Sequence, residues 1–243
     1  MYLVKLDAID STNSYLRQMA KKEDLGKWAA VTAEYQSDGR GQKGAVWQSE
    51  RGKNMICSIL VRLTDLKAKD QFLLNCAVSM GIFNALRKFD VPKLKIKWPN
   101  DIMSVSKKLG GILIENTLMG DEINQTIIGI GINVNQDHFS KDLPSAVSIK
   151  QLTGKETDRD ILLQEILVSI QQQFELIFQR KYDELWRSYD QQLFRKDKAH
   201  MFEDKQGQRF MGVIKGVSQK GLLLVEDQKE RVTAYNFKEI SYV

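Results

Sequence analysis

The sequence predicts an α+β protein, in which a mixed, largely antiparallel sheet with helices on one side is followed by a small C-terminal β-barrel. Between residues 94 and 135, short apolar runs are separated by turns that can only connect antiparallel hairpins. Two long segments, residues 70–89 and 157–193, carry apolar side chains at the spacing of one helix face. The last fifty residues contain only short strand-like runs punctuated by Gly, Asp and Lys, a pattern typical of a small barrel with its own core.

Each expected element follows from its local pattern. The run Asp10-Ser11-Thr12-Asn13 consists of residue types that favour helix N-termini, and apolar residues then recur at helical spacing. Thr157 with Asp160 resembles a capping box at the start of the second long helix. In order, we expect strands at residues 2–6, 28–35, 55–63, 94–97, 102–105, 109–115 and 125–133, helices after residue 11 and over 70–89 and 157–193, and terminal strands at 198–202, 209–217, 222–225 and 231–235.

The chain is long enough for one sizeable core and a small second domain, and the change of pattern in its last fifty residues divides it into residues 1–190 and 191–243. The net charge of +5 is mild, and a solvated Lys-rich surface accounts for it; no helix-turn-helix or zinc-finger pattern supports nucleic-acid binding. Two cysteines in apolar runs are typical of reduced thiols in a cytosolic protein. No signal peptide and no apolar run of ~20 residues is present, so we expect a cytoplasmic protein without a membrane partner.

The segment 36–54 contains four glycines and four cations between two expected strands. Gly39, Gly41 and Gly44 formally satisfy G-x-G-x-x-G, but a strand follows them where a dinucleotide fold needs a helix. Glycine lets a backbone approach an anion closely, and Arg or Lys can neutralise that anion. The segment is therefore either an anion cradle of another kind or a plain glycine-rich surface loop.

Three further segments combine polar residues, cations and glycines. Residues 97–101 read Lys-Trp-Pro-Asn-Asp, where Asn offers a donor and an acceptor and Asp could be a magnesium ligand or an orienting base. Residues 107–111 place two lysines at a hairpin tip before two glycines, and residues 129–135 thin a strand with two glycines before Asn133. Each segment also has an ordinary structural explanation: an Asx turn, a solvated lysine pair, and a structural asparagine.

Taken together and in this order, the motifs resemble those of the biotin protein ligases. The resemblance implies a catalytic domain similar to class II synthetases and a C-terminal SH3-like domain. The segments that carry it are Asp10-Ser11-Thr12-Asn13, Glu34-Tyr35-Gln36, Gly39-Arg40-Gly41, Trp47-Gln48-Ser49, Gly52, Lys97-Trp98-Pro99-Asn100-Asp101, Lys108-Leu109-Gly110-Gly111-Ile112-Leu113 and Gly129-Ile130-Gly131-Ile132-Asn133.

The resemblance further implies activation of biotin by ATP with Mg²⁺, then transfer of biotin to one lysine of a biotin carboxyl carrier protein. It assigns catalytic roles to Arg40, Lys108 and Asp101, with Asp101 also the candidate metal ligand. The implied biotin-binding residues are Ser11, Thr12, Asn13, Gln36, Gly39, Arg40, Gly41, Gln42, Lys108 and Gly111, and the implied ATP-binding residues are Trp47, Lys97, Asn100 and Asn133.

Two features depart from the family pattern. Gln42 stands where the family commonly has Arg, and a neutral amide cannot pair with phosphate, so we expect leakier release of the adenylate. The first motif begins at Asp10, so we expect no winged DNA-binding domain before it and no DNA binding. An exposed sheet edge could pair two copies into a homodimer.

Two alternatives remain open. A lipoate or octanoyl ligase or transferase would have a related fold, although the polar residues Ser11, Thr12, Asn13 and Gln36 favour a ureido ring over an alkyl tail. A non-catalytic binding module would use the basic barrel to contact nucleic acid or protein.

Overall fold

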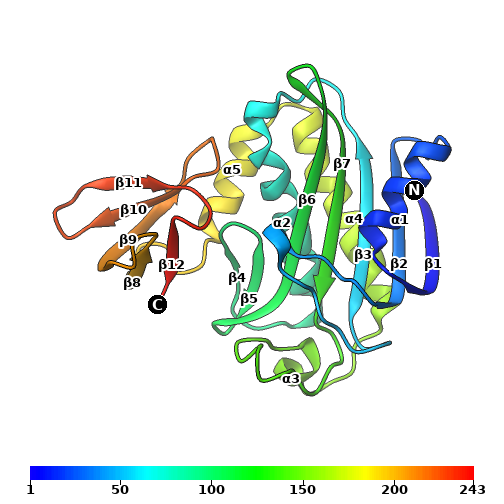
Figure 1. The fold of residues 1–243 in the computed structure, drawn as a ribbon, viewed down its shortest axis with the longest axis horizontal. Coiled ribbons are helices and arrows are strands. Elements are labelled where there is room, and N and C mark those ends of the chain that lie inside the picture. The colour runs from blue at the N-terminus through cyan, green and yellow to red at the C-terminus, as the bar shows by residue number, and fades with distance from the viewer.

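The computed structural model describes residues 1–243, except for the side chain of Lys43. It contains one seven-stranded sheet and one five-stranded sheet (Figure 1). The strands and helices in chain order are β1 (Tyr2–Ile9), α1 (Thr12–Lys22), β2 (Trp28–Gln36), β3 (Met55–Arg62), α2 (Phe72–Leu86), β4 (Leu94–Lys97), β5 (Asp101–Ser104), β6 (Lys107–Met119), β7 (Glu122–Ile132), α3 (Ile149–Thr153), α4 (Arg159–Phe178), α5 (Tyr182–Gln191), β8 (Ala199–Asp204), β9 (Arg209–Val217), β10 (Leu223–Asp227), β11 (Val232–Tyr235) and β12 (Ile240–Tyr242).

The large sheet has the order β1-β2-β3-β7-β6-β5-β4, with β1 parallel to β2 and every other neighbouring pair antiparallel. The prediction of a mixed, largely antiparallel sheet is thus confirmed. Its two central strands, β6 and β7, form a long hairpin that projects beyond the rest of the sheet at the top of Figure 1. The two lysines expected at a hairpin tip, Lys107 and Lys108, instead begin β6, because the turn that joins β5 to β6 falls at Val105 and Ser106.

Helices cover both faces of this sheet. On one face, α2 and α4 pack against alternate strand residues such as Ile59 and Ile128, which belong to the main core. On the other face, Leu16 of α1 packs against Val31 and Leu60 in a second, smaller core. The predicted placement on one side is therefore right for α2, α4 and α5, whereas α1 covers the opposite face and there borders the pocket described below.

The segment predicted as one helix over residues 157–193 is two helices, α4 and α5. The break falls at Arg180, whose φ of 56° is left-handed and cannot continue a right-handed helix. The predicted capping box at Thr157 is wrong, because the N-cap is Asp158, whose carboxylate accepts from the backbone N–H groups of Asp160 and Ile161 at 2.8 and 3.1 Å.

The C-terminal residues form an antiparallel sheet in the order β11-β10-β9-β8-β12. Within the described chain no pairing joins β11 to β12, so the sheet is open where a small β-barrel was predicted. It lies beside the β4 edge of the large sheet in Figure 1. Trp98 Nε1 donates to the carbonyl of Gly221 at 2.9 Å, which joins the two sheets.

Among the described residues, no helix has both the length and the apolar character needed to cross a membrane.

Candidate active site

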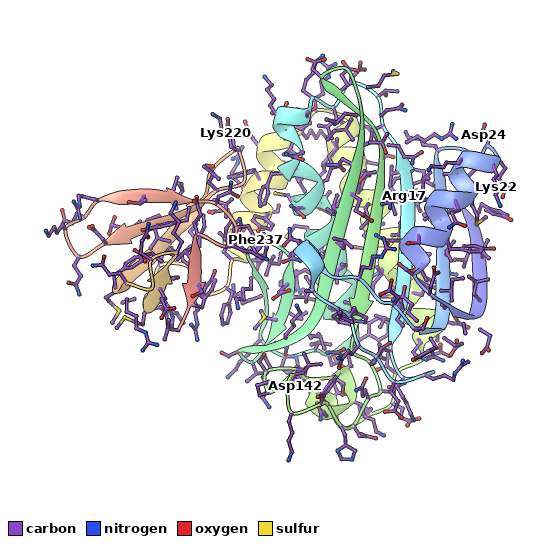
Figure 2. The ribbon with its side chains drawn as sticks, in the orientation of Figure 1. Arg17, Lys22, Asp24, Asp142, Lys220 and Phe237 are labelled. Atoms are coloured by element: carbon purple, nitrogen blue, oxygen red, sulfur yellow. The ribbon has the colours of Figure 1, made fainter. Side chains whose placement is uncertain are left out.

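A pocket of about 390 Å³ opens over the middle of the large sheet. Its walls come from the start of α1, the loop after β2, the β4–β5 turn, strands β6 and β7, and the end of the C-terminal sheet. Figure 2 shows Phe237, one of the C-terminal lining residues, at the junction of the two sheets. The predicted site residues that line this pocket are Ser11, Thr12, Asn13, Gln36, Arg40, Gly41, Gln42, Trp47, Lys97, Asn100, Asp101, Lys108 and Gly111.

One end of the pocket is a buried hydrogen-bonded network of uncharged side chains. Gln36 Oε1 accepts from the backbone N–H of Thr12 at 2.7 Å and from its hydroxyl at 2.8 Å. Ser11 is the N-cap residue of α1, yet its side chain makes no capping hydrogen bond. The polar residues at this helix start are therefore bonded across the sheet or face the pocket, and the alternative of simple capping does not hold for Ser11.

Ser58 completes this network and was not predicted. It is fully buried on β3, and its hydroxyl lies 2.7 Å from the hydroxyl of Thr12 and within hydrogen-bond distance of Asn13 Oδ1. In the sheet Ser58 is opposite Gly129, and a Cβ on Gly129 would lie only 2.6 Å from Asn13 Oδ1. Gly129 therefore makes room for the Asn13 side chain. The apolar pattern of β3 did not indicate that Ser58 belongs to this network.

Trp47 lies across the glycine-thinned strands in the middle of the pocket. A Cβ on Gly131 would be 2.3 Å from its indole ring, whereas one on Gly111 would be 3.4 Å away, in ordinary contact. Its Nε1 is buried without a hydrogen-bond partner in the described chain. Gly39 does not line the pocket, but it accepts from Trp47 N at 2.8 Å and leaves no room for a side chain there, so it shapes the loop that carries the indole.

The other end of the pocket is charged. Lys108 Nζ lies 2.6 Å from Asp101 Oδ1, and both side chains are partly exposed. Lys97 Nζ lies 4.6 Å from the centre of the Tyr242 ring; burial lowers the pKa of this lysine, and the charges of Lys108 and Arg195 lower it further against the opposing effect of Asp101. Arg40 is nearly half exposed, and its ion pair with Asp38 is long, at 3.8 Å. Its guanidinium therefore remains available to an anion.

Two predicted nucleotide ligands have structural partners. Asn100 lines the pocket, but its Nδ2 donates to the carbonyl of Ile112 at 2.7 Å. Asn133 does not line the pocket, and its Nδ2 donates to the carbonyl of Val147 at 3.2 Å. The structural explanation of Asn133 therefore accounts for its burial without a ligand.

The C-terminal sheet supplies lining residues that the sequence did not predict: Phe237, Ile240, Ser241 and Tyr242. Burial raises the pKa of Tyr242, and its hydroxyl has no hydrogen-bond partner in the described chain. Gln42 Oε1, in the loop, is likewise buried without a partner there. Both groups border the pocket, where a polar ligand could satisfy them.

Asp101 is the only carboxylate among the lining residues, and no cluster of three metal-ligating side chains occurs in the part of the chain that is described. Mg²⁺ in nucleotide sites is commonly held by one or two carboxylates together with substrate phosphates and water. The residues present therefore fit a magnesium ion held mainly by phosphates and water, for which Asp101 is the one lining carboxylate that could serve as a ligand.

The fold and the pocket, which joins buried amide and hydroxyl groups to cations, can now be compared with those of known proteins. The model of the Biotin/lipoate A/B protein ligase family matches residues 6–133, and the chain belongs to that family. It is similar to the bifunctional ligase/repressor BirA of Salmonella typhimurium, with 32% identity over 225 residues that cover 91% of this chain and 68% of that protein. BirA of Bacillus spizizenii is 30% identical over 234 residues, covering 94% and 70%.

Among solved structures, the biotin protein ligase from Aquifex aeolicus in complex with biotin and ATP has a TM-score of 0.81 at 25% identity. The match covers 99% of this chain and 97% of that one, so it includes the C-terminal sheet.

Proposed function

We propose that this chain is a biotin protein ligase that activates biotin with ATP and transfers it to a lysine of a biotin carboxyl carrier protein. The observation that carries the proposal is one pocket in which an uncharged, buried hydrogen-bonding end faces a cationic end across glycine-thinned strands. Biotin has the same division, because a neutral urea ring and a carboxylate lie at its opposite ends.

The polar end would bind the urea ring. Thr12, Asn13 and Gln36 are held by hydrogen bonds among themselves and to Ser58, so little side-chain freedom is lost when a ligand binds. Buried polar groups of this kind reject a ligand that leaves them unpaired. The apolar wall of Ile112, Ile130 and Trp47 would cover the rest of the bicyclic ring and its chain.

The cationic end would stabilise the activation step. The biotin carboxylate oxygen attacks the α-phosphorus of ATP, a C–O–P bond forms, and the bond to the β-phosphate breaks with release of pyrophosphate. Negative charge grows on the phosphoryl oxygens during this step, so fixed cations favour the transition state. Arg40, Lys97 and Lys108 would supply these charges, and Mg²⁺ bound at Asp101 would add positive charge near the outgoing phosphates.

In the second step the neutral amine of the carrier lysine attacks the acyl carbon, and AMP departs with the electron pair of the broken bond. The attacking nitrogen loses a proton to water as the amide forms. Asp101, which faces this region and pairs with Lys108, would orient the amine. Trp47 would pack against adenine, and loop residues 39–47 would shield the anhydride from water.

The test is ATP-dependent pyrophosphate release with labelled biotin or labelled lipoate, followed by transfer to a carrier domain. We expect release and transfer with biotin and little of either with lipoate, because a dithiolane cannot pair with Thr12, Asn13 and Gln36. Release with lipoate alone would favour the related ligases. The absence of biotin-dependent release would favour a binding module.

We further propose that the chain divides near residue 190, since α5 ends at Gln191 and all later strands pair within the second sheet. The C-terminal unit would then complete the nucleotide end of the pocket through Tyr242 and its neighbours. A cytoplasmic location, pairing of two copies, and lack of DNA binding stay predictions of the sequence.

A further inference from the structure

An ion pair lies directly behind the polar end of the pocket. Arg17 of α1 contacts Glu115 of β6, with 2.8 Å between the guanidinium and Oε1. The other carboxylate oxygen, Oε2, accepts from Asn13 Nδ2 at 2.8 Å. Figure 2 shows Arg17 on the side of α1 that faces the large sheet. Neither charged residue lines the pocket, yet the carboxylate reaches a residue that does.

The pair fixes which way the Asn13 amide points. An ionised carboxylate can only accept hydrogen bonds, so the NH₂ group of Asn13 must face Glu115 and Oδ1 must face Ser58. Burial raises the pKa of Glu115, but the bonds from Arg17 and Asn13 and the charges of Arg17 and Arg40 outweigh burial and lower it overall. Gly129 leaves the space that Oδ1 occupies in this orientation.

With this orientation the network has too few protons. Three oxygen–oxygen contacts join Asn13 Oδ1 to Ser58, Ser58 to Thr12, and Thr12 to Gln36 Oε1. Only the two hydroxyls of Ser58 and Thr12 carry protons for these contacts. One contact is therefore always between lone pairs. Turning the Asn13 amide over would supply the missing proton, but its oxygen would then face the carboxylate of Glu115.

We propose that Arg17 and Glu115 are positioning residues that select a ligand with N–H donors, by locking Asn13 so that the polar end of the pocket has a surplus of acceptors. The inference rests on the proposed function and extends it to the origin of ligand choice. A cyclic urea presents two N–H groups and satisfies such a surface. A ligand end without N–H groups, such as a dithiolane, leaves the surplus lone pairs uncompensated.

The test reverses the polarity of the pair while keeping its attraction, in the double variant Arg17→Glu/Glu115→Arg. A guanidinium can only donate, so it would turn the Asn13 oxygen toward position 115 and its NH₂ group toward Ser58. We expect the calorimetric Kd for biotin to rise by about 10- to 100-fold, since a donor replaces an acceptor at the ligand. Adding Asn13→Asp, which accepts on both sides, should restore part of the affinity.

The matched control exchanges Arg62 and Asp24, an exposed pair at 3.0 Å that does not contact Asn13, and should leave the Kd for biotin unchanged. Circular dichroism checks folding, and Glu115→Gln is the second variant, since its amide can present either polarity and should weaken binding by a smaller factor. The positioning role is refuted if folded variants at these positions bind biotin as the wild type does. If the wild type itself binds no biotin, the proposed function fails and the inference fails with it.

Discussion

The two ends of the pocket are built differently. The polar end is buried and internally bonded: Thr12, Asn13 and Ser58 are each at most 3% exposed, and they contact one another in a network that is one proton short. The charged end is open, with Arg40 nearly half exposed and Lys108 held by a single carboxylate. The first end is therefore preorganised for ground-state recognition, whereas the second gains its strongest contacts only when an anion arrives.

The largest effect is expected at the charged end. Lys108→Ala removes a cation from the site where phosphoryl charge develops, and we expect the single-turnover rate of adenylate formation to fall by ~10²–10³. Biotin affinity, measured without ATP, should change far less. Lys107→Ala is the matched control, since this exposed neighbour does not line the pocket. Equal losses in rate and biotin affinity would show that biotin recognition and activation are not assigned to separate ends of the pocket.

The middle of the pocket sharpens the comparison. Gly131→Ala would place a Cβ 2.3 Å from the Trp47 ring and force the indole to move, so we expect ATP affinity to fall by about tenfold or more. Gly111→Ala contacts the same ring at 3.4 Å and is the graded control, with a clearly smaller loss. Titrations of each variant with ATP and with biotin measure the two affinities. An equal loss of ATP affinity in the two variants would show that Trp47 does not take part in nucleotide binding.

How much of this site the sequence predicts depends on the range of the contacts. Ser11, Gln36 and Lys108 could be predicted because each stands where a strand or helix begins or ends and within a local motif. Ser58 and Glu115 could not, because each lies in an otherwise apolar or ordinary strand and acquires its role from partners 45 and 102 residues away. Their function depends on sheet register, which residue patterns within one strand do not fix.

The fold shows the same limit. Strands β9 and β3 lie where local alternation predicts them, with ends that differ by one residue or less. The break between α4 and α5 and the N-cap at Asp158 depend on one left-handed residue and one side-chain orientation, which the apolar periodicity does not report. Strand β12 was missed because three residues are too few for a periodic signal, yet it supplies Tyr242 to the pocket.

Gln42→Arg tests whether the charged end is incomplete in this chain. The Oε1 of Gln42 is buried without a partner in the described structure, beside the pocket, and a guanidinium at this position could pair with phosphate. We expect the adenylate to leave the variant about three- to tenfold more slowly when no carrier is present. Release of radiolabelled adenylate after gel filtration measures the rate. A variant that releases it no more slowly contradicts the role assigned to the missing charge.

The smallest effect is expected from the contact between the two sheets, which should matter for the charged end of the pocket and not for the polar end. The polar end is made by α1 and the large sheet, whereas the charged end also borders the C-terminal sheet, which Trp98 Nε1 contacts through Gly221. Trp98→Phe removes this bond and should lower the free energy of unfolding by about 1 kcal/mol, measured by urea denaturation. The KM for ATP should rise by about twofold, because only part of the lost free energy would come from a shift of the C-terminal sheet relative to the pocket.

The Kd for biotin should stay at the wild-type value, since no residue of the polar network contacts the C-terminal sheet among the described hydrogen bonds. A matching loss in biotin affinity would mean that the C-terminal sheet supports the whole pocket, and the contrast between a one-domain end and a two-domain end would no longer hold.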